Sequence, residues 1–252
     1  MIGEIMDDGL RSIALTGTCA AFVAAPVLGA LIGDGEQTDR YDTVITPPDY
    51  AFAVWAPIFA GCIASTIGQC LPQGRGEPMS RAVGWPLVGA YAMNTAWSVA
   101  AQSDRFALTP FLLPAAAGFA ATAHLRLQRA PDTTTWTALT PLSTGLLLGW
   151  TTVASAVNIA AAKVASGASP DAPRTVTASA AGLLATSAVA AGAVARSRRG
   201  RLPLALASGW GLLTTALSAN RPRRVRIVAA AGAVMIAAAA VHTGRNQHAS
   251  RG

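Results

Sequence analysis

Charged residues are scarce in this sequence: they make up 12% of its 252 residues, against about 25% in typical soluble domains. Hydrophobic residues make up 52%, and the mean hydropathy is +0.41. A single soluble core cannot bury that much apolar surface. The composition therefore argues against an ordinary soluble domain and favours a protein that is surrounded by lipid.

Lysine is almost absent, since Lys163 is the only one among the 19 basic residues. The arginines, which give most of the net charge of +7, lie in short connections between apolar runs. That placement is typical of residues that orient a membrane protein. Arginines interleaved with aromatics on a polar surface, as in nucleic-acid binding, are not seen. We therefore expect the lipid bilayer, and no nucleic acid, as a partner.

The side chains that usually carry catalysis or bind metals are also missing. Apart from Asp49, the first residue of the second run, no acidic residue lies within the apolar runs, which disfavours a proton-coupled pump. No P-loop, GxSxG, HExxH or GxGxxG element occurs in a suitable context. We interpret the cysteines as small buried hydrophobes, and the histidines are too far apart to form a ligand set. We therefore expect no metal and no catalytic residue; these residues are Cys19, Cys62, Cys70, His124, His242 and His248.

Eight apolar runs are long enough to be candidate membrane spans, at about 20 residues per crossing. The sequence thus predicts an all-α fold, an integral membrane helical bundle. Arginine clusters flank the short seventh run on both sides, so the sequence leaves open whether the chain crosses seven or eight times, and in which orientation. The runs cover residues 12–32, 49–70, 83–101, 106–127, 136–162, 175–195, 202–219 and 225–242.

Aromatic residues are concentrated in the first two thirds of the chain. Residues 1–163 hold five of the six tryptophans and every tyrosine and phenylalanine, whereas Trp210 is the only aromatic in residues 164–252. We expect a five-helix transmembrane domain at 1–163 and a C-terminal transmembrane helical extension, of about three helices, at 164–252.

The second run begins with an unusual stretch, TPPDYAFAVWAPIF. Phe52, Trp55 and Phe59 are spaced i, i+3, i+7 and share one face of the predicted helix. Pro57 cannot donate a hydrogen bond to the carbonyl of Ala53, so the sequence predicts a kink there.

Two further runs place tryptophan and asparagine on one helix face. Asn94 and Trp97 lie three residues apart, and Trp150, Ala154 and Asn158 are spaced i, i+4, i+8. Asparagine within a membrane can also join helices, and tryptophan can belong to the interfacial belt. A packing role for these residues therefore stays open at this point.

Gly145 and Gly149 form a GxxxG step in the fifth run. Glycines four residues apart share a face and let a neighbouring helix approach the backbone closely. We interpret the pair as a packing contact and not as part of a site.

Taken together, these motifs resemble the TspO/MBR family of tryptophan-rich sensory or translocator proteins. The likeness rests on a proline pair before a tryptophan-bearing second helix, N-x-x-W-S in the third helix and W-x-x-x-A-x-x-x-N in the fifth. It covers roughly residues 10–163. The matching residues are Pro47, Pro48, Trp55, Asn94, Trp97, Ser98, Trp150, Ala154 and Asn158.

The resemblance implies a five-helix bundle, commonly a homodimer, in the inner (cytoplasmic) membrane. It implies a sensor or binding protein whose pocket, covered by the loop after the first helix, holds a hydrophobic small molecule such as a porphyrin or another tetrapyrrole. Flat aromatic walls with few charges suit such a ligand. The implied ligand-binding residues are Pro47, Pro48, Tyr50, Phe52, Trp55, Phe59, Asn94, Trp97, Trp150, Ala154 and Asn158.

The sequence departs from the family pattern at several positions, so we interpret it as a divergent member. Phe59 stands where the family has a tyrosine, and Pro110 where many bacterial members have an acid. Ile159 replaces the aromatic of the family's sterol-recognition pattern. Three alternatives remain: a transporter of a small hydrophobic molecule, a membrane enzyme that modifies porphyrin, and a helical scaffold. The enzyme is disfavoured because an acid–base pair is lacking.

Overall fold

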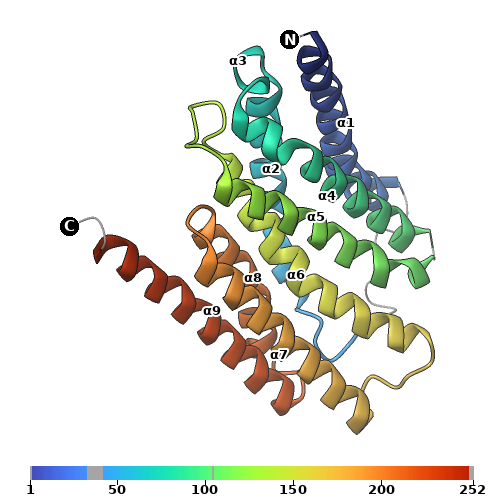
Figure 1. Cartoon of the computed structure of the whole chain (residues 1–252). Helices are drawn as coiled ribbons and strands as arrows, with labels where there is room; N and C mark the ends of the chain where they lie inside the picture. The colour runs from blue at the N-terminus through green and yellow to red at the C-terminus, as the bar shows by residue number, and fades with distance from the viewer. Residues whose placement is uncertain (1, 33–41, 104, 250–252) are drawn as a thin grey trace. The chain divides into compact units, whose positions relative to one another are not determined.

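The computed structural model describes residues 2–32, 42–103 and 105–249, and within these ranges the chain is helical and contains no strand (Figure 1). The predicted all-α membrane fold is confirmed. Residues 33–41, part of a polar connection predicted to lie outside the membrane, fall outside the described residues. The long helices are α1 (Ile2–Ile32), α2 (Trp55–Cys70), α4 (Pro78–Gln102), α5 (Thr109–Arg129), α6 (Thr140–Ala165), α7 (Pro173–Arg196), α8 (Arg201–Leu217) and α9 (Arg223–Ala249).

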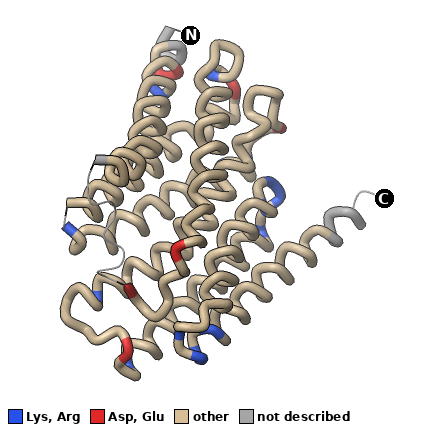
Figure 2. The backbone as a smooth tube through the Cα atoms, turned by 180° about the vertical axis from the view of Figure 1, so that it is seen from behind, with Lys and Arg blue, Asp and Glu red and all other residues tan. Residues whose placement is uncertain are grey.

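Six helical segments of the described chain are long and apolar enough to cross a membrane. Charged residues lie at helix ends and in the connections (Figure 2). Of the eight candidate spans, those at α4 and α8 do not reach this threshold. α8 has only 17 residues, about 26 Å at 1.5 Å per residue, against a hydrocarbon core of about 30 Å. Whether the chain crosses seven or eight times stays a prediction.

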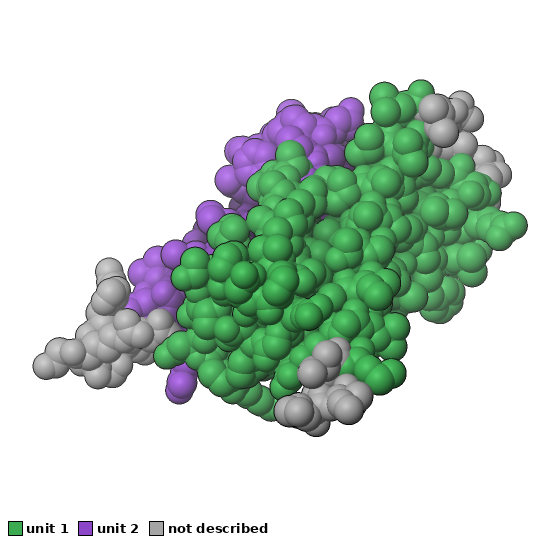
Figure 3. Space-filling model, turned by 90° about the horizontal axis from the view of Figure 1, so that it is seen from above, with its two compact units in different colours: residues 1–37, 56–144 green, residues 38–55, 145–252 purple. Residues whose placement is uncertain are grey.

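The chain divides into two compact units, shown in different colours in Figure 3. Unit 1 consists of residues 1–37 and 56–144, and unit 2 of residues 38–55 and 145–252. The borders fall at the start of α2 and within α6. The predicted division after residue 163 stays a prediction.

Aromatic packing joins the helices of unit 1. Phe22 on α1 stacks on Tyr91 of α4, with ring centroids 5.3 Å apart and 9° between the planes. Phe59 on α2 meets the ring of Phe22 edge-on, with the ring centroids 5.0 Å apart. On its other side α4 packs along α5. Near the end of α2, Ser65 and Thr140 share a hydrogen bond of 3.1 Å. Unit 1 is thus held by ring contacts and hydroxyl pairs, with few charges.

A buried ion cluster lies at the N-terminal end of unit 1. Asp8 accepts hydrogen bonds of 2.6 Å from Arg11 and from Arg81. Arg11 is only 2% exposed and also donates to the carbonyl of Arg75. One carboxylate therefore pairs with two guanidinium groups near the starts of α1 and α4.

In unit 2, α9 packs along both α7 and α8 (Figure 1). α6 approaches the start of α8 closely: a Cβ on Gly145 would collide with the carbonyl of Gly200, and one on Gly149 with the carbonyl of Leu204. The packing role predicted for the GxxxG step is confirmed.

The second helical segment differs from the sequence prediction. Residues Asp49–Val54 form a 3₁₀ helix, η2, and the α-helix begins only at Trp55. Pro57 is therefore the third residue of α2, in the first turn, where a missing N–H has no intrahelical partner to lose. The prediction that Pro57 interrupts an α-helix is wrong.

Candidate ligand-binding site

The predicted proline pair leads directly into η2. Pro47 is buried and Pro48 is half-buried with an extended backbone (ψ 157°), and the carbonyl of Pro48 accepts a 2.8 Å hydrogen bond from the N–H of Ala51. In a 3₁₀ helix, side chains three residues apart eclipse one another. This winding therefore brings Phe52 and Trp55 onto one line along the segment.

Both rings meet Trp150 of α6, and the three form the aromatic cluster of unit 2. The ring centroid of Phe52 lies 5.8 Å from that of Trp150, with the planes at 85°. The corresponding values for Trp55 are 6.1 Å and 79°. Edge-to-face pairs of this kind add about 0.5–1.5 kcal/mol beyond the buried area. Three of the residues predicted to bind ligand are thus brought together.

Trp150 is 2% exposed, and its indole N–H has no hydrogen-bond partner among the described residues. Its ring packs against the backbone of α8 at Gly211. A Cβ added to that glycine would lie 3.3 Å from Cζ3 of Trp150. A buried donor without an acceptor costs about 1–3 kcal/mol. The N–H is therefore a point where a bound acceptor would be favoured.

Trp210 of α8 also contacts η2 and was not among the predicted site residues. Its Nε1 donates a 2.8 Å hydrogen bond to the carbonyl of Ala51, and its ring meets Tyr50 edge-on at 6.3 Å. One sequence signal could have identified it: Trp210 is the only aromatic of residues 164–252, and it stands between Gly209 and Gly211.

Ala154 and Asn158 continue along α6 from Trp150. Asn158 is 8% exposed, and its Nδ2 donates to the carbonyl of Ala154 at 3.1 Å. The spacing of i, i+4, i+8 keeps the three residues on one slowly turning stripe. The predicted stripe is therefore a largely buried face of α6.

The remaining predicted residues, Phe59, Asn94 and Trp97, belong to unit 1. Asn94 is 1% exposed; its Nδ2 donates to the carbonyl of Ala90 at 2.9 Å, while its Oδ1 has no partner in the described part of the chain. Trp97 lies buried on the same helix. Their role in binding stays a prediction, to be tested residue by residue.

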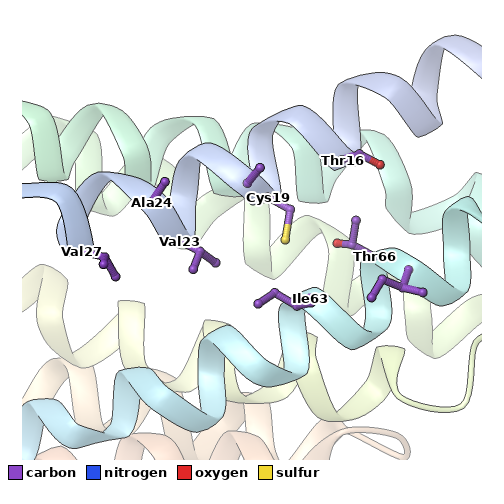
Figure 4. A pocket seen from close by; sticks show the side chains of 9 residues that line it. Thr16, Cys19, Val23, Ala24, Val27, Ile63 and Thr66 are labelled. Carbon is purple, nitrogen blue, oxygen red and sulfur yellow. The ribbon is translucent and has the colours of Figure 1, made fainter.

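Unit 1 also contains an apolar cleft between α1 and α2, with a cavity volume of about 380 Å³ (Figure 4). The hydroxyl of Thr66 points toward the thiol of Cys19 across its floor. No charged side chain lines it, so it could take up only an uncharged chain or ring. Its lining residues are Thr16, Cys19, Ala20, Val23, Ala24, Val27, Ile63, Thr66 and Ile67.

Comparison with models of protein families shows which family the chain belongs to. A family model described as TSPO-like protein matches residues 12–242. The chain belongs to this family. The matched region includes α7, α8 and most of α9, so the model describes the three C-terminal helices together with the first five. Comparisons with curated proteins and with solved structures found no match.

Family membership and six apolar helices identify a multi-pass membrane protein. The family indicates a membrane sensor or binding protein. Within the described ranges, no group of three or more His, Cys, Asp or Glu side chains could hold a metal ion. The aromatic cluster offers apolar ring surface and the indole N–H of Trp150. This combination suits a largely apolar ligand that carries a hydrogen-bond acceptor.

Proposed function

We propose that this protein is an inner-membrane sensor that binds a flat, largely apolar ligand, a tetrapyrrole such as a porphyrin, against the aromatic cluster of unit 2. The observation that carries the proposal is the indole N–H of Trp150, which is buried beside two aromatic rings and has no acceptor in the described part of the chain. A ligand that offers an acceptor atom would satisfy this group and stack its ring system on the cluster.

The surroundings of the cluster fit such a ligand. Phe52 and Trp55 are only half-buried, so they offer apolar surface beyond their contacts with Trp150. No acid or base stands among the cluster residues, which supports reversible binding over turnover. Recognition would then rest on aromatic surface and on one hydrogen bond.

Trp150→Phe is the most direct test, because it keeps an aromatic ring and removes the N–H. Purified full-length protein in detergent is titrated with protoporphyrin IX. Binding is followed by porphyrin absorbance, so that the number of tryptophans does not alter the signal. We expect the dissociation constant to rise about two- to tenfold, as loss of one hydrogen bond implies. Trp85→Phe, the same change at a 39% exposed residue outside unit 2, should leave it unchanged.

A second variant separates the cluster from the cleft of unit 1. Ile63→Trp fills the cleft, which Ile63 lines at 41% exposure. If Ile63→Trp abolishes binding and Trp150→Phe leaves the dissociation constant unchanged, the ligand occupies the cleft and the proposal is wrong. The same samples test the alternatives, because steady loss of porphyrin absorbance would indicate an enzyme, and flux into proteoliposomes a transporter.

A further inference from the structure

The segment that carries Phe52 and Trp55 is held by the C-terminal helices at two separate points, both within unit 2. One is the hydrogen bond from Trp210 to Ala51, across 159 positions of sequence. The other is an ion pair between Asp42 and Arg221, across 179 positions. The first contact is made by α8 and the second by the turn that follows it.

The contact at Ala51 bears on the winding of the segment. In an α-helix the N–H of Trp55 would donate to the carbonyl of Ala51, four residues earlier. Here that N–H is directed at the carbonyls of Phe52 and Ala53, and the carbonyl of Ala51 accepts the Trp210 indole at 2.8 Å. Ala51 itself is fully buried, so water does not compete for this carbonyl. A carbonyl can accept two hydrogen bonds, and in 3₁₀ form that of Ala51 also faces the N–H of Val54, three residues on. The Trp210 bond therefore ties this 3₁₀ turn to α8.

The winding determines how the cluster is built. In a 3₁₀ helix residues i and i+3 lie on one line, whereas in an α-helix they are about 60° apart around the axis. Phe52 and Trp55 are such a pair, and both meet Trp150. Rewinding the segment as an α-helix would keep the two rings on one face but turn them about 60° apart, and so change how they meet Trp150.

The ion pair fixes the start of the same segment. Arg221 donates two hydrogen bonds to the carboxylate of Asp42, at 2.7 and 2.9 Å. The Arg221 side chain is 11% exposed and that of Asp42 is 47% exposed. A two-bond pair with one largely buried partner has a defined geometry. Between the anchors, Val44 and Ile45 are buried at 4% and 1% exposure.

We propose that Trp210 is a positioning residue: its bond to Ala51 ties residues 49–54 to α8 and so holds Phe52 and Trp55 against Trp150, with Arg221–Asp42 as a second anchor. The C-terminal helices thereby set the shape of the ligand site. The part of this proposal that concerns ligand affinity rests on the proposed function.

Trp210→Phe tests the positioning role, because it keeps an aromatic ring beside Tyr50 and removes the indole N–H. Hydrogen–deuterium exchange is measured on the full-length protein without ligand. We expect amide exchange in residues 49–55 to accelerate about two- to tenfold, with no change in α9 and none in the Trp85→Phe control. Unchanged exchange in residues 49–55 would overturn the proposal, whether or not porphyrin binds.

The effect on the site is measured separately by titration with protoporphyrin IX. Trp210→Phe should weaken binding about two- to tenfold, because it removes the bond to Ala51. If the wild type binds and Trp210→Phe binds equally well despite faster exchange, the segment does not set the site and the proposal fails. If the wild type does not bind, the proposed function fails, while the exchange result still decides the positioning role.

The second anchor has its own test with a built-in rescue. Asp42→Arg and Arg221→Asp should each accelerate exchange in residues 42–48, and the double variant should restore it by re-forming the pair with opposite polarity. Restoration supports the anchor. Faster exchange in the double variant than in either single variant contradicts it.

Discussion

At the scale of single residues, two indole N–H groups distinguish the candidate site. The N–H of Trp210 donates to the backbone carbonyl of Ala51, whereas that of Trp150 is buried and finds no acceptor among the residues that the structure describes. Buried donors are nearly always paired in folded proteins. The N–H of Trp210 therefore stabilises the fold, and that of Trp150 would gain a hydrogen bond from a ligand that carries an acceptor.

Gly149 gives a prediction about stability at the same scale. A Cβ there would collide with the carbonyl of Leu204, a backbone atom that cannot move aside alone. We expect Gly149→Ala to lower the free energy of unfolding by about 1–3 kcal/mol. The measurement is unfolding by increasing SDS in mixed micelles, followed by circular dichroism.

Gly182→Ala on α7 is the matched control, because a Cβ at that position meets nothing within 4 Å. There the helix propensity of alanine should raise stability by about 0.5–1 kcal/mol. Equal effects of the two substitutions would mean that α6 does not approach α8 as closely as described.

At the scale of helices and connections, the apolar runs predict the helices well. α8 is predicted at 202–219 and observed at Arg201–Leu217. α4 begins at Pro78, five residues before the predicted start at 83, because proline is well accommodated in a first turn. Local pattern suffices for these elements, because burial of a long apolar face decides them.

η2 could not be predicted in this way. Residues 49–54 are tied to α8 through the carbonyl of Ala51, and the donor of that bond, Trp210, lies far along the sequence. The same holds for the site. The sequence indicates that Phe52, Trp55 and Trp150 are candidates, but their common contact depends on how this segment packs within unit 2.

Asp8 gives a prediction about one helix end. Asp8→Asn would leave the nearly fully buried Arg11 without its carboxylate, and Arg81 would lose the same partner. Breaking a buried ion pair by removing one partner costs about 3–5 kcal/mol. We expect a clear fall in the thermal unfolding midpoint in detergent. Asp7→Asn, one residue earlier at an exposed position, should have little effect; a similar fall in both variants would contradict the role of the cluster.

At the scale of the whole molecule, the family match and the contacts of unit 2 lead to the same view of the C-terminal helices. The match extends through α7 and α8 into α9, and α8 with the turn after it contacts the segment that starts the second membrane helix. The composition alone suggested a plain extension, because a single aromatic stands among residues 164–252. That single aromatic, Trp210, donates the hydrogen bond to Ala51 that ties this segment to α8.

The central claim is that a tetrapyrrole accepts the hydrogen bond offered by Trp150. The most direct measurement is the indole ¹⁵N–¹H NMR spectrum of the tryptophan-labelled protein with and without protoporphyrin IX, with the Trp150 signal assigned from the Trp150→Phe spectrum. We predict that the Trp150 signal shifts and exchanges more slowly with solvent on saturation, while the Trp85 signal stays in place. Saturable porphyrin binding that leaves the Trp150 signal unchanged would contradict the account.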